Sequence, residues 1–337
     1  MVNIDMNIIV QKYGGSSLSN KSALKNICKR INYYLKNKDA KLVVVVSAQG
    51  KTTDNLIKLS KYYTKSQDKK SLDFLLATGE MKSAALLSMM LNEQNIKSTP
   101  LTGWQAGILT DSTYGEAKII DIYKQNILKA LESNSVVIVT GFQGVTKLGD
   151  ITTLGRGGSD LSATALAAKL NAISCEIYSD IDGVFSTDPK IFCDASLIKK
   201  ISYDEMIEAS SAGAKVMHNR SVMVAKKFSL PLKIKNSRSS YNSNNGTIIE
   251  DTSKGENIEK SKIKMITKKD ELTEISIIGE MMLSNIDITK DIYQIANKLN
   301  SKIYMITFSE LAIHLITDTK NSEEFLKSLH NKLIAET

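Results

Sequence analysis

The sequence predicts an α/β protein in which a large domain, with a mostly parallel central sheet sandwiched by helices, precedes a small ferredoxin-like module. Two observations predict the large domain: apolar runs of strand length recur along the chain, and helix-like segments of about ten residues or more separate them. A third observation, a strand–helix–strand–strand–helix order over residues 263–337, predicts the module. A chain of 337 residues is long enough for both, since domains commonly have roughly 100–200 residues.

The elements of the large domain are predicted from the spacing of apolar residues. Residues 42–46 are continuously apolar, which is typical of a strand that is buried on both faces. Residues 21–36 place Leu24, Ile27 and Ile31 on one face of a helix. By the same reasoning we expect further strands at residues 7–11, 135–140, 173–178 and 232–235, and further helices at 71–91, 161–170, 203–212 and 221–228.

The composition changes at residues 235–262, which are rich in Ser, Asn and Gly. We therefore expect a catalytic domain over residues 1–250, a linker over 251–262 and the module over 263–337. Within the module we expect a strand at 274–278, a helix at 287–299, paired strands at 302–308 and 311–317, and a helix at 322–333. Residues 263–266 are expected to add an edge strand to its sheet.

Charge and cysteine content argue against several classes of protein. The net charge is +8, but the 44 basic residues are spread along the chain, so we expect no nucleic acid as a partner and a mild preference for an anionic substrate. No apolar run reaches the roughly 18 residues of a membrane span, and the N-terminus lacks a secretory pattern, so we expect no membrane partner. The isolated cysteines Cys28, Cys175 and Cys193 predict neither a zinc site nor disulfides and fit a cytoplasmic protein.

The first chemical signal is Lys12-Tyr13-Gly14-Gly15-Ser16-Ser17, which lies between a predicted strand and a predicted helix. Glycines let the backbone approach a ligand closely, and the N–H groups of a turn and a helix start favour a phosphate. Lys12 adds a positive charge at the end of the strand. Taken alone, a plain glycine turn with a solvated lysine explains this segment equally well.

The second signal is Leu-Gly-Arg-Gly-Gly-Ser-Asp at residues 154–160, which opens a predicted helix. Ser159 and Asp160 suit a helix N-terminus, and a free N-terminus attracts anions. Arg156 is suited to a bidentate grip on a carboxylate or a phosphate. We interpret this segment as an anion site.

The third signal is the segment 178–190, which begins where a predicted strand ends. Open α/β sheets bind ligands at the carboxyl ends of their strands. The acids Asp180 and Asp182, with neighbouring hydroxyls, suit a ribose or a phosphate–Mg²⁺ group. Ordinary turn chemistry is the alternative explanation.

Six segments together resemble aspartate kinases of the amino-acid kinase family. They keep the family's order, and Thr-Leu-Gly-Arg-Gly-Gly-Ser-Asp at 153–160 is the most specific of them. The others are Lys-Tyr-Gly-Gly-Ser-Ser at 12–17, Val-Ser-Ala-Gln-Gly-Lys-Thr-Thr-Asp at 46–54, Ala-Thr-Gly-Glu at 77–80, Leu-Thr-Gly-Trp-Gln-Ala-Gly-Ile at 101–108 and Gly-Ala-Lys-Val-Met-His at 213–218.

The resemblance implies the amino-acid kinase fold and the phosphorylation of the L-aspartate β-carboxylate by ATP. This reaction is the first step of the aspartate-derived amino-acid pathway towards lysine, threonine and methionine. A free carboxyl with a pKa of about 3.9 is ionised at pH 7, so no general base is needed. What is needed is neutralisation of charge on the transferred phosphoryl group. Mg²⁺ is expected to arrive mainly on the ATP phosphates, so no metal site of protein ligands is expected.

The resemblance also implies a role for each matching residue. Lys12 would neutralise charge on the transferred group, and Asp160 would orient Lys12, so these two are the expected catalytic residues. Arg156 would clamp the α-carboxylate of aspartate and Glu80 its ammonium. The same pocket would contain Ser47, Thr53 and Ser159. The residues expected to hold ATP are Lys12, Gly14, Gly15, Ser16, Ser179, Asp180, Phe185, Lys190, Lys215 and Val216.

Two of these positions depart from the family pattern. Phe185 stands where a tyrosine is common, and Lys190 stands where an arginine is common. A lysine lacks the planar fork of an arginine, so we expect a weaker grip on phosphate at position 190.

The C-terminal residues resemble one ACT module, at 275–282 and 303–313, whereas the family usually carries two. We expect no separate first module in these residues, and we expect the remaining module to lack its last strand. We therefore expect the module to form dimers, the protein to be a homodimer or a higher homo-oligomer, and inhibition by lysine or threonine to be slight.

Two alternative functions stay open. One is a catalytically silent sensor of amino acids or nucleotides on the same fold. The other is a related kinase that forms an acyl phosphate on glutamate or a similar acid, because the sequence does not reveal the length of the substrate side chain.

Overall fold

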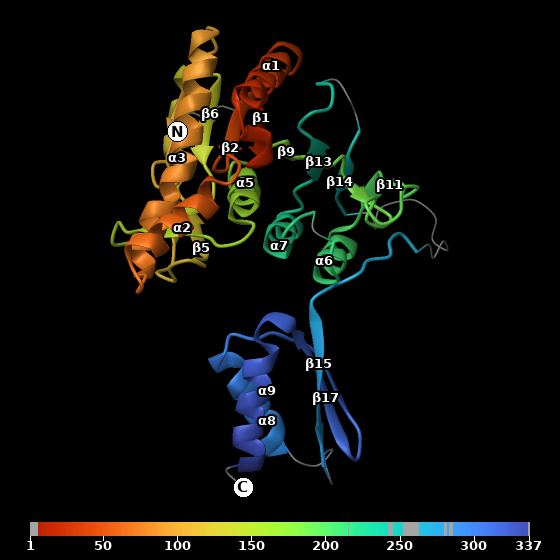
Figure 1. Cartoon of the computed structure of the whole chain (residues 1–337). Helices are drawn as coiled ribbons and strands as arrows, with labels where there is room; N and C mark the ends of the chain where they lie inside the picture. Colours follow the sequence, from red (N-terminus) through yellow and green to blue (C-terminus); the bar gives the residue numbers. More distant parts are fainter. Residues whose placement is uncertain are drawn as a thin grey trace. The chain divides into compact units, whose positions relative to one another are not determined.

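The structure, a computed structural model, describes residues 6–214, 216–241, 245–251, 263–279, 282 and 286–335 (Figure 1). The chain forms two compact units, residues 1–267 and 268–337. The first unit contains a large, mostly parallel sheet between helices, and the second contains a small antiparallel sheet with two helices. The predicted α/β fold is therefore confirmed.

The first unit is built on an eight-stranded sheet. Its strands lie in the order β12 (Lys200–Ile201), β14 (Thr247–Ile249), β13 (Leu232–Asn236), β9 (Ser174–Ser179), β1 (Ile8–Tyr13), β2 (Lys41–Val46), β6 (Val136–Thr140) and β3 (Ser98–Leu101). The six strands from β13 to β3 are parallel, whereas β14 is antiparallel to β13. Five of the six residues of β2 are buried, because helices cover both faces of the sheet.

Each face of this sheet packs against its own set of helices (Figure 1). The first face is covered by α1 (Lys21–Asn37) and α3 (Lys69–Glu93). The second face is covered by α4 (Gln125–Ser133), α5 (Gly158–Lys169), α6 (Tyr203–Ser211) and α7 (Asn219–Lys227). Alternate residues of β2 serve the two faces: Val44 packs with α1 and α3, and Val45 packs with the second set.

The smaller elements lie in the connections between these strands and helices. α2 (Thr52–Tyr63) follows β2. A four-stranded sheet has the order β5 (Ile119–Ile122), β4 (Ile108–Thr110), β7 (Gln143–Val145) and β8 (Ile151–Thr153), and β10 (Val184–Phe185) pairs with β11 (Leu197–Ile198). β8 ends just before the predicted anion segment 154–160, so this second sheet positions that segment.

α3 is the one described helix that is long and apolar enough to cross a membrane. Half of its most apolar stretch is buried inside the protein, where Ala84, Leu87 and Leu91 pack on the sheet. Burial of this kind is typical of the core helix of a globular domain.

The second unit has the predicted strand–helix–strand–strand–helix order. Its elements are β15 (Leu272–Ile278), α8 (Ile286–Lys298), β16 (Ile303–Phe308), β17 (Ala312–Asp318) and α9 (Ser322–His330). β17 is the central strand and pairs antiparallel with both neighbours. Ile313 and Leu315 of this strand pack against Ile292 of α8 and Phe325 of α9. Within the described residues, the outer edge of β15 has no partner strand.

The predicted edge strand at residues 263–266 is wrong, because these residues belong to the first unit. The Ile266 N–H donates to the Ser186 carbonyl at 2.9 Å, the Lys264 ammonium lies 2.8 Å from Glu205, and Met265 packs on the core of the first unit. The second unit accordingly begins at Lys268, five residues after the predicted boundary. Apart from Asp251, the predicted linker lies outside the described residues.

Candidate active site

The carboxyl ends of the central parallel strands meet at one edge of the sheet. Tyr13 at the end of β1 lies level with Val46 of β2 and Tyr178 of β9. Val46 in turn lies level with Thr140 of β6. The residues at which the chain leaves the sheet at this edge include Gly14, Ser47, Gly141 and Ser179. Ligands of open α/β sheets bind at such an edge, and three of these four residues are predicted site residues.

Lys12 and Asp160, the two predicted catalytic residues, form an ion pair at this edge. The Lys12 ammonium lies 2.6 Å from the Asp160 carboxylate, and the two side chains are only 11% and 15% exposed. Asp160 lies in the first turn of α5, where the positive end of the helix dipole favours an anion. Lys12 is thus fixed in position with little access to water.

Glycines bring two loops together beside this ion pair. A Cβ atom on Gly15 would lie 2.8 Å from the Ala48 carbonyl oxygen, so only glycine fits there. The Gly50 N–H also donates to the Gly15 carbonyl at 2.9 Å. Ser16 begins a short 3₁₀ turn and is exposed. The loop that follows β1 and the loop that follows β2 therefore form one surface, which includes Ser47.

Glu80 of α3 points towards the second of these loops. One carboxyl oxygen, Oε1, accepts a 2.9 Å hydrogen bond from the Ala48 N–H. The other, Oε2, is buried and has no hydrogen-bond partner among the residues that the structure describes. Burial raises the pKa of Glu80 to about 7, although the Ala48 hydrogen bond opposes this shift. A buried carboxyl with one unused oxygen is suited to a ligand ammonium.

Arg156 lies at the tip of a turn between two left-handed glycines, Gly155 (φ +74°) and Gly157 (φ +68°). Its side chain is exposed and forms no ion pair in the described part of the chain. Ser159, three residues on, is buried against Gly141, where an added Cβ would lie 2.9 Å from the Ser159 Cβ. The helix N-terminus that carries Ser159 and Asp160 therefore lies against the ends of the strands. Thr53, the remaining predicted pocket residue, is half-buried in the first turn of α2.

Ser179, a predicted ATP-binding residue, follows Tyr178, which contacts the glycine loop. The Gly14 N–H donates to the carbonyl of Tyr178 at 3.2 Å, and the Ser237 N–H donates to that of Ser179 at 2.8 Å. Asp180 follows and is exposed.

The remaining predicted ATP-binding residues are more widely spread. Phe185 is half-buried in the hairpin of β10 and β11, and Val216 packs against the core. Lys190 lies on an exposed turn and forms no ion pair with a described residue. Lys215 lies outside the described residues.

A buried polar network supports the sheet below this edge. Burial would raise the pKa of Glu176, but the Lys235 ammonium at 3.0 Å, with hydrogen bonds from Tyr34 and Tyr178, holds the pKa of this carboxyl below its usual value. Tyr178 also stacks on Tyr13, with ring centroids 4.8 Å apart. The network thereby joins the strands that precede Gly14 and Ser179.

Two buried hydroxyl groups near this edge received no role from the sequence, although one of them, Ser17, belongs to the glycine motif. Ser17 Oγ, in the glycine loop, and Thr140 Oγ1, at the end of β6, have no hydrogen-bond partner within the described residues. The signal that could have found Thr140 is a polar residue that follows a buried apolar strand and precedes a glycine.

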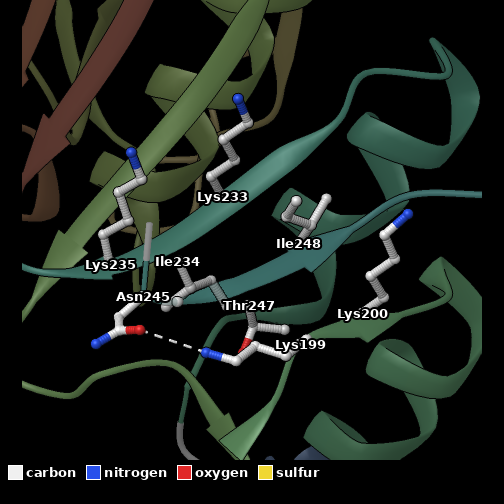
Figure 2. Close-up of a pocket in the computed structure, with 9 residues that line it drawn as sticks. Lys199, Lys200, Lys233, Ile234, Lys235, Asn245, Thr247 and Ile248 are labelled. Carbon is white, nitrogen blue, oxygen red and sulfur yellow. Dashed lines mark hydrogen bonds between the residues drawn. The ribbon is translucent and has the colours of Figure 1, made fainter. Parts of the chain in front are cut away.

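A separate cavity of about 390 Å³ lies beside β12, β13 and β14 and contains none of the predicted site residues. Four lysines line it, but Lys200 is paired with Glu250 and Lys235 with Glu176, each at 3.0 Å. Figure 2 shows that the four ammonium groups do not converge on one point. The strand edge, and not this cavity, therefore contains the predicted site residues and is the candidate active site.

The described residues contain no group of three or more His, Cys, Asp and Glu side chains that is close enough to hold a metal ion. A Mg²⁺ ion that is carried by nucleotide phosphates needs only one or two protein carboxylates. Two carboxylates lie at this edge, Asp160, which is paired with Lys12, and Asp180, which is exposed.

Comparisons with known proteins match both the sequence and the fold. Residues 7–236 match the model of the amino acid kinase family. The chain is 42% identical to the aspartokinase of Geobacillus stearothermophilus over 316 residues, which cover 90% of this chain and 76% of that protein. It is 44% identical to aspartokinase 2 of Bacillus subtilis over 274 residues, which cover 81% of this chain and 66% of that protein. The chain thus spans about two thirds to three quarters of the length of these relatives.

Solved structures show the same fold. Aspartokinase III of E. coli in complex with aspartate and ADP has a TM-score of 0.73 at 21% identity, over 96% of this chain and 83% of that one. The aspartate kinase of Synechocystis has a TM-score of 0.64 at 31% identity, over 95% of this chain and 54% of that one.

Proposed function

Since this chain belongs to the aspartokinases of the amino acid kinase family, we propose that it transfers the γ-phosphoryl group of ATP to the β-carboxylate of L-aspartate. The observation that carries the proposal is the Lys12–Asp160 ion pair of 2.6 Å at the strand edge, within the glycine loops that match the family. The products are β-aspartyl phosphate and ADP. A β-carboxylate oxygen forms a bond to the γ-phosphorus, and the bond from that phosphorus to the oxygen shared with the β-phosphate breaks.

The site supplies positive charge rather than a base. The attacking carboxylate is already ionised at pH 7, since its pKa is about 3.9. Lys12 is held against the first turn of α5, where it neutralises negative charge on the transferred phosphoryl group. Asp160 orients the Lys12 ammonium. Mg²⁺ enters on the nucleotide phosphates and neutralises further charge there.

The amino-acid substrate is held at both ends of its backbone. Glu80 offers its unused Oε2 to the substrate ammonium, and Arg156 grips the α-carboxylate with its planar fork. Ser47, Thr53 and Ser159 line the space between them. This arrangement leaves the β-carboxylate of aspartate free to face the phosphoryl group near Lys12.

The nucleotide lies along the strand edge from the glycine loop towards β10. Gly14, Gly15 and Ser16 approach the phosphates, with Ser179 and Asp180 beside them. Phe185, Lys190, Lys215 and Val216 hold the remainder of the nucleotide. Support for this assignment comes from the family's motifs and from the hydrogen bond that joins Gly14 to Tyr178.

An assay of ADP release tests the proposed reaction. The purified protein is supplied with ATP, Mg²⁺ and, in separate reactions, aspartate, glutamate, N-acetylglutamate or UMP. We expect release with aspartate alone. Release with glutamate instead would show a kinase for a longer acid, and release with none of the four would favour a silent sensor.

The second unit serves as a dimer-forming, ACT-type module of a cytoplasmic homo-oligomer. Support comes from the outer edge of β15, which has no partner strand in the described part of the unit, and from exposed apolar side chains on β15 and β16: Ile278, Met305 and Phe308. Apolar groups of this kind are commonly covered by a second copy of the chain.

A further inference from the structure

We infer that Asp73 and Arg220 are positioning residues that fix Arg156 relative to Glu80, and that they thereby set the recognition of the α-amino-acid end of the substrate. The inference deepens the proposed function and rests on its assignment of Arg156 and Glu80. Neither positioning residue contacts the substrate, and sequence reasoning pointed to neither of them.

The turn that carries Arg156 begins where two short segments lie side by side. The Ala117 N–H donates to the Thr153 carbonyl at 2.9 Å. A Cβ on Gly155 would lie 3.1 Å from the Gly115 carbonyl oxygen. The position of the base of the turn therefore depends on the position of residues 115–117.

Asp73 of α3 holds the N–H groups of both segments. Its Oδ2 accepts hydrogen bonds from the Gly115 N–H at 2.9 Å and the Thr153 N–H at 2.8 Å, and its Oδ1 accepts from the Thr153 hydroxyl at 2.6 Å. The side chain is 1% exposed. Charge-assisted hydrogen bonds to a buried carboxylate are stronger than neutral ones, so Asp73 anchors both segments to α3.

Arg220 of α7 holds the carbonyl groups of the same two segments. One guanidinium nitrogen donates to the Leu154 carbonyl at 2.6 Å, and the other donates to the Ala117 carbonyl at 2.9 Å. His218, two residues before Arg220, lies close to Gly157 of the same turn, where an added Cβ would be 2.4 Å from the His218 Cβ. A planar fork that bridges two carbonyls restricts both segments at once.

Asp73 and Glu80 lie on the same side of α3. They are seven residues apart, which is two helical turns, or roughly 10 Å along the axis. Both are buried, at 1% and 3% exposure. One rigid helix therefore carries the group proposed to bind the substrate ammonium and the group that anchors the turn of Arg156. The distance between the two substrate contacts is consequently set by α3.

The test compares Arg220→Met and Arg220→Lys with the wild-type protein. Arg220→Met removes both carbonyl contacts, and Arg220→Lys can restore one of them. We expect Arg220→Met to raise the aspartate KM about tenfold. This is less than the ~10²-fold loss of activity that can follow when a substrate-orienting group is misplaced. The ATP KM should not change, and Arg220→Lys should recover part of the loss.

A second measurement separates positioning from general loss of structure. The α-amide of L-aspartic acid keeps the β-carboxylate and the ammonium but lacks the α-carboxylate that Arg156 is proposed to grip. Its inhibition constant should stay the same in the Arg220 variants while the aspartate KM rises. The variants should therefore discriminate less between aspartate and its α-amide than the wild-type protein does. A merely destabilised protein would lose affinity for both compounds.

Lys227→Met is the matched control. Lys227 is exposed and lies on α7, as Arg220 does, but at the opposite end of this helix. It should leave both constants unchanged. Arg156→Lys, assayed in parallel, tests the proposed function itself. If Arg156→Lys raises the aspartate KM and Arg220→Met does not, the inference is wrong and the proposed function stands. If Arg156→Lys also has no effect, both the role of Arg156 and its positioning are overturned.

Discussion

Lys12 and Asp160 are 148 positions apart in the sequence, yet they form a short ion pair that is nearly closed to water. In the proposed mechanism, the Lys12 ammonium acts on charge that develops during phosphoryl transfer. Its contribution should therefore appear in the rate of the reaction more than in the binding of ATP.

We predict that Lys12→Ala lowers kcat by about 10²–10³, equivalent to ~2.7–4 kcal/mol, as removal of a group that stabilises a transition state commonly does. The ATP KM should change much less. Lys21→Ala, at an exposed lysine that begins α1, is the control and should keep full activity. Steady-state kinetics measure both effects. Thermal unfolding verifies that the variant is folded, because the substitution removes the ion-pair partner of Asp160. Turnover near that of the wild type would remove Lys12 from the mechanism.

Glu80 gives a second prediction, on pH. Burial raises the pKa of Glu80 to about 7, so this residue is increasingly ionised as the pH rises from about 6 to about 8. An ionised Glu80 attracts an ammonium, so the aspartate KM should fall over this range. Glu80→Gln should show a higher KM that lacks this pH dependence. A wild-type KM that is flat between these values would contradict the assignment of Glu80 to the substrate ammonium.

The same shift affects stability with a definite sign. The pKa of Glu80 is higher in the folded protein than the value of 4.5 in the unfolded chain. Protonated Glu80 therefore makes its full contribution to the free energy of unfolding below pH 4.5, and this contribution is lost as the pH rises through about 7. The loss is of the order of 3 kcal/mol, since each pKa unit corresponds to about 1.4 kcal/mol. Denaturant unfolding at several pH values should show this slope in the wild type and a smaller slope in Glu80→Gln.

Most of the candidate site could be predicted only through resemblance to a family, because its residues come from separate parts of the chain. The glycine loops and Arg156 were visible as local motifs, and their roles stay predictions. Asp73 and Arg220 could not be predicted, since four of the five groups to which their side chains form hydrogen bonds are backbone groups of segments distant in the sequence. Nothing in the side-chain pattern around a residue reveals a contact to a distant backbone.

At the scale of the elements, the turn between β8 and α5 depends on Gly157. Gly157 has a left-handed backbone, and a Cβ there would lie 2.4 Å from the His218 Cβ. We predict that Gly157→Ala destabilises the protein by roughly 1–3 kcal/mol, from backbone strain and the displaced α7 terminus together. Because the turn carries Arg156, the aspartate KM should also rise.

Gly149→Ala separates these two causes. Gly149 is also left-handed (φ +88°), but an added Cβ meets nothing within 4 Å. It should therefore show the cost of the backbone conformation alone, about 1 kcal/mol, and an unchanged aspartate KM. Equal unfolding free energies for the two variants would mean that contact with His218 does not matter.

Several elements were predicted from the sequence because they have a clear apolar face, and others were missed because they are exposed or very short. α1, with Leu24, Ile27 and Ile31 buried on one side, lies within one residue of its predicted bounds. α2 was missed because none of its residues is buried. The strands of the four-stranded sheet were missed because they have only three or four residues, too few to show alternation.

For the molecule as a whole, the order of elements in the second unit could be predicted, but its starting point could not. The composition of residues 235–262 indicated a boundary, yet 263–267 return to the first unit through single contacts such as Ile266 with Ser186. The placement of this segment depends on two hydrogen bonds, one ion pair and the packing of Met265 on the core, and none of these contacts leaves a periodic pattern in the sequence.

The oligomeric state is the prediction at this scale. We expect light scattering to give the mass of a dimer or a larger assembly. Met305→Asp should shift it to the monomer, because Met305 is 55% exposed on β16 and a charge there opposes burial between two copies. Lys298→Asp, at the end of α8, is a control that changes charge away from the sheet and should keep the assembly. A monomeric wild-type protein would overturn the proposed role of the module.

In the proposed role of Glu80, its half-ionised state would also couple amino-acid binding to the release of protons into the solvent. At pH 7 a group with a pKa of about 7 carries its proton in half of the molecules, and an arriving ammonium favours the ionised form. Binding of aspartate should therefore release about half a proton per site. In calorimetry, the heat of binding should depend on the ionisation enthalpy of the buffer, and this dependence should vanish in Glu80→Gln. A buried side chain thus couples the concentration of a metabolite to the local pH.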